Sequence, residues 1–107
     1  MDFTIVLARA EIAMLTREQG GRDTPLQGGL SYRPNHNFWP DADFLQTCIG
    51  FIDLPVGHDF SSSKPVEVQI RFLVWPELQA QLYPGREWRI QEASKIVGYG
   101  KILQILT

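Results

Sequence analysis

Two arginines, Arg22 and Arg33, belong to segments whose backbone is restricted by neighbouring residues. Arg22 lies in the run Gly-Gly-Arg-Asp-Thr-Pro at residues 20–25, and Arg33 lies in Tyr-Arg-Pro at residues 32–34. Glycine reaches positive φ without steric cost, and proline fixes its own φ and restricts the residue before it. A guanidinium held in this way can bind a carboxylate or a phosphate through several N–H donors. The alternative is that both arginines brace the long first connection by donating hydrogen bonds to its carbonyls.

The two histidines are the side chains whose ordinary pKa suits acid–base chemistry near neutral pH. His36 lies in Pro-Asn-His-Asn-Phe, where a packed or surface histidine is favoured over a catalytic one. His58 precedes Asp59 in a loop, and together they offer two metal ligands without a third, which makes a weak site. A small hydrolase that uses His58 and Asp59 remains an alternative.

The remaining candidates for chemistry each have a simpler structural interpretation. Asp41 and Asp43 could hold a cation loosely, but a solvated acidic turn is favoured. The serines at 61–63 lack the Gly-x-Ser-x-Gly turn that exposes a nucleophile, and Cys48 lies in an apolar run typical of a buried strand. The Gly-x-x-x-x-Gly-Lys-Ser/Thr loop that binds nucleotide phosphates is absent from the sequence. We therefore expect a protein that is not an enzyme, with no cofactor, no bound nucleotide and no metal site.

The composition describes one small domain spanning residues 1–107. A chain of 107 residues buries a single core, and 44% apolar residues with a net charge of −2 are typical of a globular protein. That charge argues against a nucleic-acid-binding surface spread over the whole molecule, but it allows a local basic patch. The lone cysteine has no disulfide partner, so we expect a reducing, cytoplasmic compartment. No apolar run approaches the roughly 18 residues of a membrane-spanning helix, so no membrane is expected as a partner.

Alternating apolar and polar residues indicate a series of β-strands. In residues 3–15 the even-numbered positions from 8 to 14 are apolar and share one face, as in a half-buried strand. Further strands are predicted at residues 45–52, 66–73, 87–91 and 95–106. Gly50 interrupts the second of these runs, and Gly98 and Gly100 mark bulges or close approaches in the last. No helix is predicted, so the pattern favours an all-β barrel or sandwich.

The aromatic residues offer a second clue. We expect Trp88 and Phe38 to fill the core, and Trp39 and Trp75 to cover its ends. If some of these rings are exposed instead, they form an apolar patch that a partner or a second copy of the chain would cover.

Two segments of the chain resemble the third, C-terminal domain of elongation factor Tu. In that family a strand ends in Leu-Thr/Ser-Lys-x-Glu-Gly-Gly-Arg-His-Thr-Pro, and Gly-Tyr-Arg-Pro-Gln follows. Here residues 15–25 are Leu-Thr-Arg-Glu-Gln-Gly-Gly-Arg-Asp-Thr-Pro, and residues 31–35 are Ser-Tyr-Arg-Pro-Asn. Residues 88–100 are also similar to the family's Phe-x-Ile-Arg-Glu-Gly-Gly-Arg-Thr-Val-Gly-x-Gly. The resemblance covers nearly the whole chain and implies a six-stranded antiparallel β-barrel, here without the GTPase domain.

The resemblance also implies where a partner binds. The family's third domain packs on the GTPase domain, contacts the T-stem of aminoacyl-tRNA and forms part of the docking surface for the nucleotide exchange factor. Arg22 and Arg33 match arginines of the family's motifs. Asn35 stands at the family's Gln, at the seam with the GTPase domain, and Lys95 stands at the basic position after the Gly-Gly turn. These four residues are the candidate surface for a protein or RNA partner.

Several departures from the family pattern remove positive charge or alter a turn. Gln91 replaces an arginine, Asp23 replaces a histidine, and Ala93-Ser94 replaces the Gly-Gly turn, so a longer or differently shaped loop is expected there. We expect a non-catalytic binding module that acts through protein–protein contacts, as a mimic, a regulator or an immunity-type protein. The alternative is a translation-associated domain that binds tRNA weakly, with a dissociation constant of roughly 10⁻⁴ M.

Overall fold

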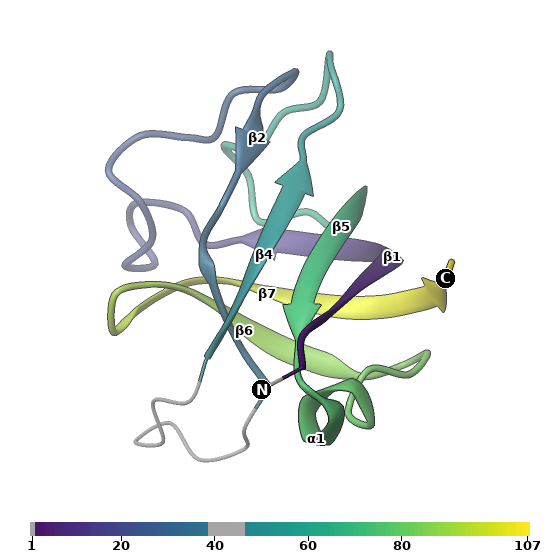
Figure 1. Cartoon of the computed structure of the whole chain (residues 1–107). Coiled ribbons are helices and arrows are strands. Elements are labelled where there is room, and N and C mark those ends of the chain that lie inside the picture. Colours follow the sequence, from purple (N-terminus) through teal and green to yellow (C-terminus); the bar gives the residue numbers. More distant parts are fainter. Residues whose placement is uncertain (1, 39–46) are drawn as a thin grey trace.

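The structure, a computed structural model, describes residues 2–38 and 47–107, which form seven strands and one short helix (Figure 1). The elements are β1 (Thr4–Met14), β2 (Ser31–Tyr32), β3 (Asn35–Asn37), β4 (Cys48–Asp53), β5 (Val66–Val74), α1 (Pro76–Gln79), β6 (Glu87–Glu92) and β7 (Lys95–Ile105).

Six of these strands close into an antiparallel barrel, as expected from the sequence. The neighbours run in the order β4-β3-β6-β7-β1-β5, and β5 pairs with β4 to complete the circle. The seventh strand, β2, pairs with β4 alone among the strands of the described residues. Tyr32 lies opposite Ile52 and Asn35 lies opposite Ile49, so β2 and β3 follow β4 in one unbroken register. The interruption between them falls at Arg33-Pro34, because proline has no N–H for the ladder.

The strand predictions are largely confirmed, with β1 as the clearest case. Ala8, Ala10, Ile12 and Met14 are all buried, and the residues between them face outward. Strands β2 and β3 were not predicted, because two or three residues are too few to show an alternating pattern. Gly50 does not break its strand, which continues through it from Cys48 to Asp53.

The expectation of no helix is wrong for one segment. Pro76–Gln79 forms a single helical turn after β5, with Pro76 at its start and Leu78 buried beneath it. Proline suits the first turn because its φ is already helical and its missing N–H has no partner there. A four-residue helix shows too little periodicity to be recognised in the sequence.

The core contains an aromatic cluster built around Trp88. Its indole stacks on Phe38 with ring centroids 5.2 Å apart, and Phe72 meets it edge-on at 5.6 Å. Trp88 and Phe38 are both buried, which confirms the prediction that they fill the core. Trp75 is half-buried and packs against the same core at the end of β5, whereas Trp39 lies outside the described residues.

Two glycines of β7 are required by this packing. A Cβ on Gly100 would lie 2.4 Å from ring carbons of Trp88, and one on Gly98 would lie 2.8 Å from the sulfur of Met14. Both are therefore close-approach positions, one of the two roles expected for them. The register of β7 shifts at two places. Against β1 it shifts at Leu103, away from both glycines, and against β6 it shifts at Val97, so Gly98 also borders a bulge.

Candidate functional site

The turn that precedes Arg22 is fixed by its own hydrogen bonds. Thr16 and Gln19 bond reciprocally, since the Thr16 N–H donates to Gln19 Oε1 at 2.8 Å and the Gln19 N–H donates to Thr16 Oγ1 at 3.2 Å. The N–H groups of Gly20 and Gly21 return to the carbonyls of Arg17 and Thr16, which is the Schellman arrangement. Gly20 has φ +89°, so the expectation of a left-handed glycine in this loop is confirmed. These hydrogen bonds therefore fix the path of the backbone that leads to Arg22.

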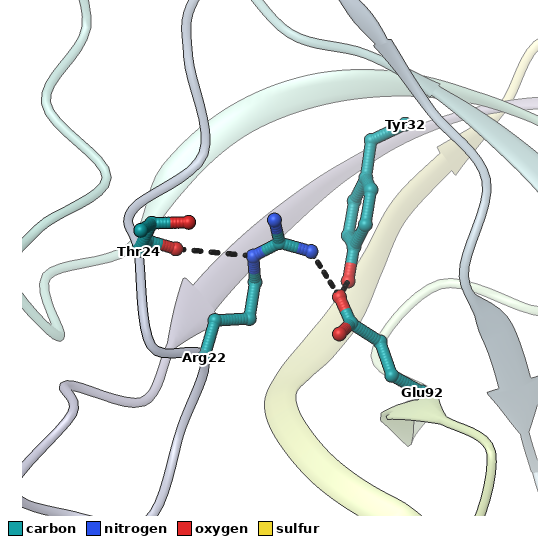
Figure 2. Close-up of polar contacts among 4 residues, drawn as sticks. All are labelled: Arg22, Thr24, Tyr32 and Glu92. Carbon is teal, nitrogen blue, oxygen red and sulfur yellow. Dashed lines mark hydrogen bonds and ion pairs between the residues drawn. The ribbon is translucent and has the colours of Figure 1, made fainter.

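Arg22 is joined to a carboxylate that lies 70 residues further along the chain. Its Nη1 donates to Glu92 Oε2 and forms an ion pair with it, and its Nε donates to the Thr24 carbonyl at 3.2 Å (Figure 2). The Tyr32 hydroxyl donates to the same Glu92 oxygen at 2.5 Å, and the guanidinium carbon lies 5.2 Å from the centre of the Tyr32 ring. These contacts tie the first connection, β2 and the end of β6 together. Arg22 therefore has the bracing role that the sequence left as one of two alternatives.

The electrostatics of this cluster favour a charged pair beside a neutral tyrosine. Burial raises the pKa of Tyr32, and its hydrogen bond to the Glu92 carboxylate raises it further, so the hydroxyl stays protonated as a donor. Burial lowers the pKa of Arg22, but its contacts with Tyr32 and Glu92 outweigh this and raise it overall. Such a cluster positions the backbone of the first connection against β2 and the end of β6.

Replacing Arg22 with alanine is expected to lower the free energy of unfolding by about 1 kcal/mol, because Glu92 and Tyr32 lose their charged partner while remaining partly accessible to water. Urea denaturation followed by tryptophan fluorescence measures this change. Arg17→Ala, in the same connection, is the matched control because Arg17 is exposed; it should change stability by less than about 0.5 kcal/mol. Equal effects of the two substitutions would contradict the bracing role.

The other three candidate residues lie at the same end of the barrel as this cluster. Asn35 is paired with Gln91 across β3 and β6, and Lys95 is paired with Glu92 across the β6–β7 turn. Arg33 directly follows Tyr32 in the chain, and both Arg33 and Lys95 are exposed. The structure therefore gathers the predicted residues at one end of the barrel, with Arg22 held inward and two cations turned to solvent.

Glu92 and Tyr32 are the members of this site that sequence reasoning did not select. Glu92 accepts hydrogen bonds from both Arg22 and Tyr32, but these contacts join segments that are 70 and 60 residues apart in the sequence. The sequence could have indicated one contact of Glu92, because a two-residue turn at Ala93-Ser94 places Glu92 directly opposite the candidate residue Lys95. No local pattern indicates that Arg22 reaches the same carboxylate.

The β6–β7 turn has two residues, Ala93 and Ser94, so of the two expected alternatives, a longer or a differently shaped loop, the longer loop is wrong. Ala93 adopts φ +53°, and it is the one non-glycine residue with positive φ in residues 2–38 and 47–107. This conformation is costly for a residue with a Cβ. Gln91 supports the turn from below, since its Nε2 donates to the Ser94 carbonyl at 3.3 Å.

Ala93→Gly is expected to raise the free energy of unfolding by about 0.5–1 kcal/mol, because glycine adopts positive φ without the steric penalty. Thermal unfolding by circular dichroism gives the shift in Tm. Ser94→Gly is the matched control, since Ser94 does not have positive φ and glycine there only adds freedom to the unfolded chain. A gain at Ser94 and none at Ala93 would contradict the assigned turn geometry.

Of the side chains considered for chemistry, His36 and Cys48 are buried, whereas His58 and Asp59 lie in an exposed loop. His36 is fully buried between Trp88 and Gly50, and Cys48 is buried at the start of β4, where burial raises its pKa to about 12. Asp59 Oδ1 accepts hydrogen bonds from the backbone and hydroxyl of Ser61, and these bonds lower its pKa. Within the part of the chain that the structure describes, no three His, Cys, Asp or Glu side chains are grouped as metal ligands. Asp41 and Asp43 lie outside the described residues.

Comparison with models of known protein families finds none that matches this chain. Among residues 2–38 and 47–107, no helix is long and apolar enough to cross a membrane.

Proposed function

We propose that this chain is a non-catalytic protein-binding module, and that its contact surface is the barrel end bearing Arg33, Asn35 and Lys95. The observation that supports this proposal is that one basic residue of this end is bonded within the fold while two others are exposed to solvent. Arg22 is held by Glu92 and Thr24, whereas Arg33, next to Tyr32 in the chain, and Lys95, opposite Glu92, are exposed. A rigid base with protruding cations suits a partner that presents carboxylates.

The resemblance to the third domain of elongation factor Tu suggests the kind of partner. A small barrel with this end would act in the cytoplasm, as a mimic that competes for proteins docking on the translation factor's third domain, or as a regulator or immunity-type protein. The contact would be maintained by complementary charge at the rim and by the fixed backbone of the Arg22 cluster. Such an interface needs no nucleotide and no cofactor.

A translation-associated domain that binds tRNA is the second candidate function, supported by the same exposed Arg33 and Lys95. Two observations weigh against it. Glu92 neutralises Arg22, and the chain carries a net charge of −2. Since each phosphate contact contributes through counterion release, a surface with two exposed cations binds RNA only weakly.

The test is an affinity pull-down from native lysate with the wild-type chain and an Arg33→Ala/Lys95→Ala variant, followed by mass spectrometry and RNA extraction. Arg22 is left intact because its substitution would disturb the loop itself. Lys64→Ala/Lys101→Ala is the matched control, since it removes the same charge from exposed positions elsewhere. A protein partner lost with the Arg33/Lys95 variant and retained with the control is the expected result. tRNA lost in that way would favour the second candidate, and identical recoveries from all three chains would overturn both.

A further inference from the structure

One outer face of the barrel is apolar over three adjacent strands. Strand β5 lies between β1 and β4 (Figure 1). The alternating burial of these strands turns several apolar side chains outward. We call this set the apolar outer face: Ile5, Leu7, Ile49, Phe51 and Leu73. Ile5 is 64% exposed, and Ile49 and Phe51 are 38% and 37% exposed, although outward positions of a soluble sheet are normally polar. A contiguous patch of this kind marks a contact surface more often than isolated exposed residues do.

The strand register arranges this face in rows. In the first row, Leu73 lies between Ile5 on β1 and Ile49 on β4, and it is the direct partner of both. In the second row, Arg71 lies between Leu7 and Phe51. In each of these two rows, β1 and β4 therefore both carry an apolar residue, one on each side of β5.

The third row continues the same arrangement with opposite charges. Gln69 of β5 lies between Arg9 on β1 and Asp53 on β4. Arg9 forms an ion pair with Glu67, and Asp53 lies 3.6 Å from Arg71, with all four side chains well exposed. Exposed pairs of this kind contribute little, so their members can change partners at low cost.

A two-fold axis parallel to β5 makes this face complementary to itself. Rotation about that axis sets each β1 residue against the β4 residue of the same row in the second copy. Ile5 then meets the partner's Ile49, Leu7 meets the partner's Phe51, and Arg9 meets the partner's Asp53. In these rows the apolar residues of each flanking strand face apolar residues, and Arg9 faces Asp53, twice per interface. Arg71 and Gln69 of β5 lie at the axis, beside their own symmetry mates. This is the isologous geometry of a symmetric dimer.

We propose that the chain forms a homodimer through the apolar outer face, with the two-fold axis along β5 and the Arg9–Asp53 pairs at one border. The dimer does not depend on the function proposed above, because its face is built from β1, β4 and β5 and leaves Arg33 and Lys95 outside. Arg71 lies near the axis in each copy. Its guanidinium sits 5.3 Å from the centre of the Phe51 ring and near Asp53, and this placement directs the charge away from its symmetry mate.

The first test is analytical ultracentrifugation of the wild-type chain and Ile5→Lys from about 1 μM to about 1 mM. Ile5 lies on the outer surface, so circular dichroism should show an unchanged fold. The wild type is expected to dimerise, and Ile5→Lys to raise the dimer dissociation constant at least about a hundredfold, because the substitution occurs twice in each interface. Val56→Lys is the matched control, since Val56 is 82% exposed but lies outside this face; it should dimerise like the wild type.

The second test uses charge reversal to check the pairing itself. Asp53→Arg and Arg9→Asp should each be monomeric, because each substitution places like charges opposite one another in both Arg9–Asp53 pairs. Mixed in equal amounts, the two variants should form a heterodimer, since the arginines of one copy then meet the aspartates of the other. A monomeric wild type at about 1 mM overturns the proposal and points to a different protein as the occupant of this face. A wild-type dimer that Ile5→Lys leaves intact, or a charge-reversed mixture that stays monomeric, also overturns it.

Discussion

Replacing Trp88 with phenylalanine is expected to lower the free energy of unfolding by about 2–4 kcal/mol. The indole Nε1–H donates to His36 Nδ1 at 3.0 Å inside the barrel, where His36 is fully buried. Phenylalanine leaves that ring nitrogen without a donor, and a buried polar atom without a partner costs about 1–3 kcal/mol. The smaller ring also leaves a cavity beside Phe38 and Gly100. Denaturant unfolding at pH 7 measures the loss.

A double-mutant cycle separates the hydrogen bond from the cavity. In a His36→Phe background the acceptor is already absent, so Trp88→Phe should cost less there by about 1–2 kcal/mol. Ile90→Val, which removes one methyl group from the same core and touches no polar contact, should cost only about 0.5–1.5 kcal/mol. Additive effects of the His36 and Trp88 substitutions would show that the bond contributes nothing.

Acidification between about pH 6.5 and pH 4 is expected to destabilise the protein through His36. Trp88 Nε1 can only donate, so His36 Nδ1 is the acceptor and Nε2 carries the proton, donated to the Gly50 carbonyl at 3.1 Å. Burial lowers the pKa of His36 from 6.5 to about 4, against a smaller opposing effect of the Gly50 carbonyl. The unfolded chain therefore binds a proton at a higher pH than the folded chain does.

The direction of the effect follows from this order of pKa values. The contribution of neutral His36 to the free energy of unfolding is fully present above pH 6.5 and is lost as the pH falls towards 4. At about 1.4 kcal/mol per pKa unit, the loss amounts to about 3 kcal/mol. Urea unfolding at several pH values from 7 to 4.5 should show this slope in the wild type.

His36→Gln is the control for this slope, because its amide can accept from Trp88 and donate to Gly50 but does not titrate. The variant retains whatever slope the carboxylates contribute, so the difference between the two chains isolates His36. Parallel stability curves for the wild type and His36→Gln would contradict the buried, neutral state of the ring.

Buried His36 and braced Arg22 bear on function in the same way. Both side chains have chemistry that a partner or substrate could use, and both use it within the fold instead. The surfaces that we propose for contact are the barrel end with Arg33 and Lys95, and the apolar outer face on the side of the barrel. Binding at the first surface and dimerisation at the second are separately testable, because no residue is shared between them.

The sequence by itself determined most of the strand framework. The alternation in β1 and β5, and the Gly-Gly turn before Arg22, express local backbone preferences that hold whatever the rest of the chain does. The single core and the aromatic residues that fill it followed from the same pattern. Segments of two to four residues, such as β2, β3 and α1, were too short to carry such a signal.

Tertiary structure alone decided what the polar side chains do. Arg22 and Glu92 are 70 residues apart, and His36 and Trp88 are 52 residues apart, so each contact depends on which strands are neighbours in the closed barrel. The apolar outer face likewise arises because β5 lies between β1 and β4 in a particular register. Alternation fixes the face on which a residue points, but the partner it meets there is set by strand order and register, which arise only when the barrel closes.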